Sequence, residues 1–198
     1  NLGVNTHFSS KIASLDTNNR TVELKRADQD ESLRYRNIVL ATGSRPALPR
    51  VPGLELENVF SIKWAGDALR LSAIASPGMR ACVVGAGFIG LEVTQALFRR
   101  GLKVTLLEMR PRVLPELLEP ALSIRVKEQI EGFGVEVLTG SLLKGIHGRS
   151  QVKYASASGR RLKTDLVVFA TGVKPRTELA VMGKVKLGRT GAIATDRR

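Results

Sequence analysis

The stretch Gly85-Ala86-Gly87-Phe88-Ile89-Gly90 follows an apolar run at residues 80–84 and precedes a helical pattern at 91–100. It matches G-x-G-x-x-G, in which the first glycine permits a tight turn, the second lets a phosphate approach the backbone, and the third lets helix and strand pack closely. The amino-terminal end of the next helix carries about half a positive charge, which favours a bound pyrophosphate. The stretch predicts a dinucleotide-binding turn, although glycines spaced this way also occur in ordinary tight turns.

A second apolar run, at 103–107, ends in Glu108, which stands 18 residues after Gly90. At this position a carboxylate accepts hydrogen bonds from the adenosine ribose hydroxyls. The negative charge favours NAD, because it would repel the 2′-phosphate of NADP. NADP stays possible because of Arg110 and Arg112, since each could attract that phosphate or belong to a solvated loop.

The order of patterns between residues 81 and 138 is strand, glycine-rich turn, helix, strand, helix, strand. This alternation produces right-handed βαβ units with parallel strands, so we expect an α/β fold with a Rossmann-like parallel sheet. In the first helix, apolar spacing predicts a buried stripe made of Ile89, Val93, Ala96 and Leu97.

Short β-rich runs separated by turn clusters predict an antiparallel β-meander on each side of this unit. The first meander has runs at 12–16, 21–25 and 33–41. The second has runs at 142–146, 151–155 and 162–163. Residues 37–41 are apolar on both faces, which predicts a strand covered on both sides, and a further apolar strand is expected at 165–170.

Two segments with the same plan bracket the parallel unit. Val39-Leu40-Ala41-Thr42-Gly43-Ser44-Arg45-Pro46 and Val168-Phe169-Ala170-Thr171-Gly172-Val173-Lys174-Pro175 both pass from an apolar run through Thr-Gly to proline. Such a pair suits a chain that leaves one sheet, builds another and returns. The prolines of 45–53 indicate a stiff linker, and the spacing over 63–75 predicts a helix.

The composition is that of a globular protein with a basic excess. The 198 residues are 43% hydrophobic and 25% charged, with a formal net charge of +13. Ala81–Leu91, the longest mostly apolar stretch, falls short of the roughly 20 residues that span a membrane. The only cysteine, Cys82, excludes an internal disulfide, and together with His7 and His147 it leaves no metal-ligand spacing, so we expect no metal.

The first residues show neither an initiator methionine nor an export signal, and we expect a cytoplasmic protein. Both ends stop without a capping element. We therefore expect a piece of a longer chain.

In combination, these segments resemble the pyridine nucleotide-disulfide oxidoreductases, and within them the branch of NADH oxidases and coenzyme A-disulfide reductases. The resemblance covers nearly the whole chain. It rests on the Ala41–Pro46 segment, the Gly85–Gly90 turn with Leu91-Glu92, the strand that ends in Glu108, Arg112-Val113-Leu114-Pro115, and the Ala170–Pro175 segment.

The resemblance implies an FAD-binding domain interrupted by an NAD(P)-binding domain. It assigns residues 1–50 to a partial FAD-binding domain, 51–172 to the NAD(P)-binding domain and 173–198 to the returning FAD segment. The implied full-length enzyme is a homodimer that passes hydride from NAD(P)H to FAD and on to a disulfide, oxygen or a redox protein. The family's earlier G-x-G-x-x-G, redox cysteine and later Gly-Asp motif are absent here, so we expect this piece to be inactive alone. Cys82 lies in an apolar strand and does not replace the redox cysteine, and Arg176 stands where the family commonly has asparagine.

Residue by residue, the resemblance implies that Phe88 and Ile89 line the NAD site and that Gly172 lies where backbone approaches the nicotinamide. Lys63 matches a basic residue near the flavin, and Glu92 matches a carboxylate on the flavin side of the cleft. Both side chains would serve equally as ordinary surface residues. The segment expected close to FAD is Ala41, Thr42, Gly43 and Ser44.

Two other classes of function remain as alternatives. One is a non-catalytic module that senses NAD, against which the flavin-type segments on both sides of the parallel unit argue. The other is a basic nucleic-acid-binding domain, against which the scattered Lys and Arg and the few aromatic residues argue. No role is assigned to His7 or His147.

Overall fold

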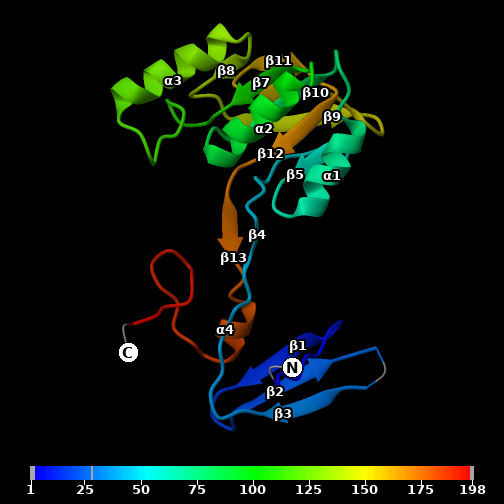
Figure 1. Ribbon diagram of the computed structural model, residues 1–198, viewed down its shortest axis with the longest axis vertical. Helices are drawn as coiled ribbons and strands as arrows, with labels where there is room; N and C mark the ends of the chain where they lie inside the picture. Colours follow the sequence, from blue (N-terminus) through cyan, green and yellow to red (C-terminus); the bar gives the residue numbers. More distant parts are fainter. Residues whose placement is uncertain (1–2, 28, 197–198) are drawn as a thin grey trace. The chain divides into compact units, whose positions relative to one another are not determined.

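The computed structural model describes residues 3–27 and 29–196 (Figure 1). By its internal contacts the chain divides into two compact units. Residues 46–173 form the first, here named the central unit, and residues 1–45 with 174–198 form the second, the flanking unit. The chain therefore leaves the flanking unit once and returns to it.

A five-stranded sheet with the order β5-β12-β6-β7-β8 organises the central unit. Its strands are β5 (Val59–Ser61), β6 (Arg80–Val84), β7 (Lys103–Leu107), β8 (Glu136–Leu138) and β12 (Leu166–Phe169). Every neighbouring pair is parallel. The predicted Rossmann-like parallel sheet is confirmed, whereas β5 was not foreseen.

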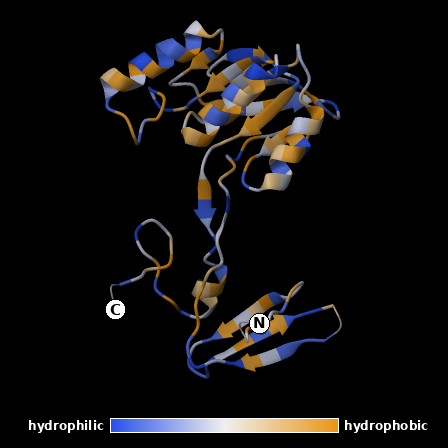
Figure 2. Ribbon diagram, viewed as in Figure 1, coloured by the Kyte–Doolittle hydropathy of each residue, from blue (hydrophilic) through white to orange (hydrophobic). Residues whose placement is uncertain are grey.

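Both faces of this sheet are covered, which explains why the buried residues of its strands are mostly apolar on both faces. On one face lie the helices α1 (Ala65–Ile74), α2 (Phe88–Arg99) and α3 (Pro120–Gly132). On the other lies the antiparallel sheet of β9 (Leu143–Gly148), β10 (Val152–Ala157) and β11 (Arg160–Lys163). Alternate residues of β6 enter the two cores: Val83 packs with the helices and Cys82 with the second meander. In Figure 2 the hydrophobic colours gather on the central strands, while α3 alternates between hydrophilic and hydrophobic.

Helix α2 begins at Phe88, inside the glycine motif, and not at the predicted residue 91. Its buried residues are Gly90, Thr94 and Leu97. Two members of the predicted stripe, Ile89 and Ala96, are exposed instead. The phase of the helix is set by Gly90, because a Cβ there would lie 1.8 Å from the carbonyl oxygen of Gly85. Only a glycine can occupy the point where helix and turn meet.

The flanking unit is built on an antiparallel meander of β1 (Lys11–Asp16), β2 (Thr21–Lys25) and β3 (Glu31–Arg34). Its buried core consists of Leu15, Val22 and Leu24. The short helix α4 (Glu178–Met182), which belongs to the returning segment, adds Leu179 to this core. The meander was expected, and α4 was not.

The expectation of a buried strand at residues 37–41 is wrong. This segment is irregular, and 89% of Val39 is exposed. A strand exists only where a neighbour completes its backbone hydrogen bonds. No strand within the described ranges pairs with 37–41, so its apolar pattern alone does not create one.

The two Thr-Gly segments meet where the chain passes between the units, as the paired strands β4 (Ser44–Pro46) and β13 (Val173–Pro175). Each copy accepts a backbone hydrogen bond at its glycine and donates one from its threonine. The equivalent bonds are Arg176 N to Gly43 O (2.9 Å), Ala47 N to Gly172 O (3.0 Å), Thr42 Oγ1 to Arg176 O (2.5 Å) and Thr171 Oγ1 to Ala47 O (2.7 Å). The two similar sequence segments are thus two equivalent connections between the units, with matching hydrogen bonds.

In the described part of the chain, no helix has the length and apolar character needed to cross a membrane.

Candidate functional site

The central unit holds a cavity of about 570 Å³ at the carboxyl ends of its parallel strands. Strand β6 is the switch point of the sheet, since the chain proceeds to β7 on one side and later returns to β12 on the other. Ligands of open α/β sheets bind outside the carboxyl ends of the strands at such a point. The candidate residues that line the cavity are Gly85, Gly87, Phe88, Ile89, Glu108 and Gly172.

The three motif glycines have different surroundings. Gly85 has a φ of +105°, and a Cβ on it would lie 2.6 Å from the carbonyl oxygen of Ala170. Gly90 packs against Gly85 and does not line the cavity. A Cβ on Gly87 would meet nothing within 4 Å. The outer two glycines are therefore required by packing, while the middle one keeps space open at the cavity wall.

The amino-terminal end of α2 faces the same space. Gly87 is the N-cap residue and has no side chain to cap the helix, and the first-turn amides of a helix lack partners within it. These amides and the helix dipole favour an anion at the cavity wall. Phe88 and Ile89, which are 63% and 48% exposed, add apolar surface beside them.

Glu108 is only 7% exposed, and its carboxylate is held by backbone amides. Oε2 accepts a hydrogen bond from the amide of Ala86 at 2.7 Å, and Oε1 accepts one from the amide of Arg110 at 2.8 Å. Glu108 thus fixes the glycine turn to the end of β7, a task that the sequence did not reveal. A carboxylate offers about four acceptor positions, so room remains for two ligand hydroxyls.

The two nearby arginines are in different situations. Arg110 lines the cavity and forms an ion pair with Glu116, which lines it as well. Arg112 is not part of the lining; its Nη2 donates to the carbonyl oxygen of Pro115 at 3.2 Å, and its buried Nε has no partner among the described residues. The one arginine at the cavity is balanced by a carboxylate.

Several candidate residues lie elsewhere. Glu92 is exposed on α2 and does not line the cavity. Lys63 is also outside the lining, and its Nζ lies 5.1 Å from the ring centroid of Trp64. The remaining four belong to the flanking unit: Ala41, Thr42, Gly43 and Ser44.

Sequence reasoning missed most of the apolar lining. Ile62 follows the unforeseen β5. Pro49 was interpreted only as part of a stiff linker, and Pro46 as part of that linker and of the first Thr-Gly segment, but neither was expected to line a site. Other missed lining residues are Met109, Leu114, Leu117 and Leu142. The available signal was position for Met109, which comes two residues after the end of β7. Ile62 gave no such signal, because the strand before it has no recognisable pattern.

Cys82 lies in the middle of β6 and is 1% exposed. Burial raises the pKa of its thiol to about 12, with a smaller contribution from Glu136. A thiol with so high a pKa is a poor nucleophile at neutral pH, which fits a structural role. Across residues 3–27 and 29–196, no three His, Cys, Asp or Glu side chains are grouped so that they could hold a metal ion.

Comparison with known proteins gives consistent relatives. The chain is 34% identical over 190 residues to an NADH oxidase from Methanocaldococcus jannaschii, which covers 93% of this chain and 42% of that protein. It superposes with a TM-score of 0.87 and 35% identity on an NAD-dependent persulfide reductase from A. fulgidus, covering 94% of this chain and 35% of that one. It also superposes, at a TM-score of 0.87 and 25% identity, on an engineered water-forming NADPH oxidase that was derived from the Lactobacillus brevis NADH oxidase and is bound to NADPH, covering 94% and 42%.

The chain spans less than half the length of the curated relatives it matches. Residues 1–198 match one family along their whole length, under the description pyridine nucleotide-disulphide oxidoreductase. The chain belongs to the pyridine nucleotide-disulphide oxidoreductase family.

Proposed function

We propose that this chain is the NAD(P)H-binding part of an FAD-dependent oxidoreductase and that NAD(H) is its preferred dinucleotide. The observation that carries the proposal is the cavity of the central unit. There the open space at Gly87, the amino-terminal end of α2 and the Glu108 carboxylate border one space of about 570 Å³. Each matches a part of a dinucleotide: the pyrophosphate for the first two and a ribose for the third.

Within this proposal, each group has a defined task. The turn at 85–90 and the first turn of α2 hold the pyrophosphate. Glu108 accepts ribose hydroxyls with the acceptor positions that Ala86 and Arg110 leave available. Gly172, which bears no side chain, lets the nicotinamide approach the end of β12. When bound, the dinucleotide supplies a hydride.

The preference for NAD rests on charge. Glu108 repels a 2′-phosphate, and Glu116 neutralises Arg110, the arginine at the cavity. The engineered NADPH oxidase carries a glycine-to-alanine substitution and, 18 positions later, an aspartate-to-alanine substitution. Gly90 and Glu108 are separated by the same 18 positions. In the engineered protein an arginine also replaces the residue directly after that aspartate. In that protein, removal of a carboxylate and gain of a cation accompany bound NADPH.

The flavin, the final acceptor and the assembly belong to the whole protein. We propose that residues 41–44 contribute to FAD binding there, that Lys63 and Glu92 lie on the flavin side, and that a homodimer acts in the cytoplasm. The relatives include an NADH oxidase and a persulfide reductase, so oxygen, a disulfide or polysulfide and a redox protein all stay open as acceptors. The 198 residues contain no second G-x-G-x-x-G, and we expect no stoichiometric flavin on this chain alone.

Calorimetric titration with NADH and NADPH tests the proposal. NADH should bind more tightly, and Glu108→Ala should narrow the difference, because it removes both the hydroxyl acceptor and the repulsive charge. Glu128→Ala, which removes an exposed carboxylate on α3 outside the cavity, is the matched control and should change neither affinity. Tighter binding of NADPH by the unmodified chain would contradict the NAD assignment, and binding of neither nucleotide would overturn the proposal.

A further inference from the structure

The sheet formed by β9, β10 and β11 has two different faces. Its inner face packs on the parallel sheet through apolar side chains such as Ile146, Val152 and Leu162. Residues 143–163 contain six cationic residues and no Asp or Glu. We name their exposed side chains the cationic face: Lys144, Arg149, Lys153, Arg160, Arg161 and Lys163.

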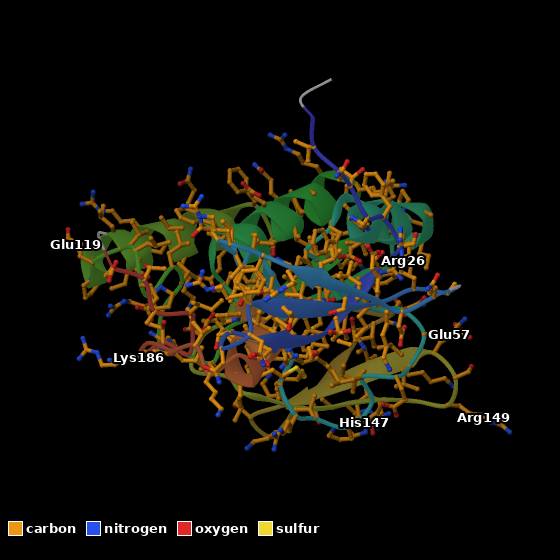
Figure 3. All side chains as sticks on the ribbon, turned by 90° about the horizontal axis from the view of Figure 1, so that it is seen from below. Arg26, Glu57, Glu119, His147, Arg149 and Lys186 are labelled. Carbon is orange, nitrogen blue, oxygen red and sulfur yellow. The ribbon has the colours of Figure 1, made fainter. Side chains whose placement is uncertain are left out.

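Few acidic groups oppose this charge. Within the described part of the chain, Arg160 is the only member of the cationic face in an ion pair, with Glu136 at 2.8 Å. Glu57, whose backbone bonds to Ser150 and Val152, is the acidic residue at the edge of the sheet. Figure 3 shows the Arg149 side chain extending away from the tip of the β9–β10 hairpin, with His147 further along the same region. The other five cationic side chains therefore have no ion-pair partner among residues 3–27 and 29–196.

A stack of three side chains crosses the sheet between these charges. Tyr154 on the central strand β10 stacks on His147 of β9, with ring centroids 4.5 Å apart and an interplanar angle of 11°. The guanidinium of Arg161, from β11 on the other side, lies 3.8 Å from the centroid of the Tyr154 ring. A register shift between Val152 and Tyr154 leaves both Lys153 and Tyr154 unburied. His147 is also held by Ser156, whose Oγ lies 3.0 Å from Nε2.

We infer that the cationic face is a docking surface for an acidic segment of a partner protein. Unpaired cations spread over three adjacent strands complement a row of carboxylates, and such complementarity speeds association and sets orientation. A nucleic acid fits less well, because proteins that bind single strands offer free aromatic faces for base stacking. The neighbours of Tyr154 on both adjacent strands already cover its ring. This inference does not depend on the dinucleotide site.

Fluorescence anisotropy with a labelled oligoglutamate peptide at low salt tests the docking surface. The triple variant Arg149→Glu, Lys153→Glu and Lys163→Glu should weaken binding at least about tenfold, since it reverses charge on the surface itself. The control variant Lys25→Glu, Arg34→Glu and Lys186→Glu changes exposed cations of the flanking unit. Both variants lower the net charge equally, by six from +13. The affinity of the control variant for the peptide should fall less than about threefold, because distant charges are screened.

Equal weakening in both variants would overturn the inference, since net charge alone would then explain binding. A labelled single-stranded oligonucleotide of the same charge serves as the competing ligand. If it binds more tightly than the peptide and loses affinity in the same variant, the partner is a nucleic acid and the protein assignment fails. Circular dichroism verifies folding of each variant, and neither set of substitutions touches the residues that line the cavity.

Discussion

The central and flanking units bury their apolar residues in different ways. The central unit covers both faces of its parallel sheet with its own helices and its own meander, and side chains such as Val83, Leu106 and Leu166 are fully buried. Among its described residues the flanking unit buries four apolar side chains, and three of them, Leu15, Val22 and Leu24, form one small cluster. It leaves Phe8 81% and Val39 89% exposed. The cavity lies wholly within the central unit, so substitutions in that unit test both its folding and its ligand binding.

Truncation of a core leucine in each unit gives the largest expected effect. Leu106→Ala should destabilise the central unit by about 2–5 kcal/mol, because the side chain is fully buried and the surrounding core cannot close the void that the truncation leaves. Leu24→Ala should cost less, since its small cluster has fewer neighbours to lose. The single tryptophan, Trp64, belongs to the central unit, so its fluorescence during urea unfolding reports on that unit. If Leu24→Ala shifts this transition as much as Leu106→Ala, the units unfold together and the contrast fails.

Gly87→Val tests whether the completed core and the ligand site are separable. The branched side chain would fill open space at the cavity and block the first-turn amides of α2. Loss of charge-assisted hydrogen bonds, at roughly 1.5–3 kcal/mol each, should weaken NADH binding at least tenfold. Circular dichroism should change little, because no atom lies within 4 Å of the new Cβ position.

Gly132→Val is the matched control, at another glycine whose Cβ would meet nothing within 4 Å. It should leave NADH affinity unchanged, and NADH should raise the unfolding temperature of this control but not of Gly87→Val. If Gly87→Val binds NADH as well as the parent chain, the turn at 85–90 has no part in binding.

The same contrast shows which features the sequence could predict. The turn at 85–90 and Glu108 were predictable because their signal is local: glycines at fixed spacing, then a strand that ends in a carboxylate. Residues 37–41 and β5 failed in opposite directions. The former is apolar but lacks a neighbouring strand, while the three residues of β5 show no pattern and become a strand by pairing with β12. The cavity lining was equally hidden, because residues as distant as Pro46, Leu117 and Leu142 meet only in the folded chain.

A smaller effect should come from Glu116→Gln, which changes a charge at the cavity without touching the core. It releases Arg110 from its ion pair and removes a carboxylate that would repel a 2′-phosphate. The pair is exposed, with 49% and 70% of the side chains accessible, and exposed pairs contribute about 0.2–1 kcal/mol. We therefore expect the ratio of NADPH to NADH affinity to rise about 1.4- to fivefold in calorimetric titrations. Glu131→Gln, which breaks the Lys127 pair on α3, should leave the ratio unchanged; an equal rise there would point to net charge.

The smallest expected effect is a difference in acid sensitivity between the units. In the central unit, Asp165 joins β12 to β6: Oδ1 accepts from Arg80 Nη2 at 2.6 Å, and Oδ2 accepts from the backbone amide of Arg80 at 2.8 Å and from Nε at 3.0 Å. The Arg80 side chain, helped by that amide, lowers the pKa of Asp165 below its ordinary value of 3.8. In the flanking unit, the backbone amide of Asn19 is the main cause of the lowered pKa of Asp16.

A carboxyl whose pKa is lower in the folded than in the unfolded chain stabilises the fold above the unfolded pKa, and this stabilisation disappears as the pH falls through the folded pKa. In the parent chain, the free energy of unfolding measured by Trp64 fluorescence should therefore decrease below about pH 4. Asp165→Asn should lower stability near neutral pH by about 1 kcal/mol or less, because the ion pair is partly exposed. The variant should also lose less stability than the parent chain as the pH falls below about 4. Asp16→Asn is the matched change in the flanking unit, and it should not alter the loss of stability at low pH that Trp64 fluorescence reports. If Asp16→Asn reduces this loss as much as Asp165→Asn does, the two units share one unfolding transition.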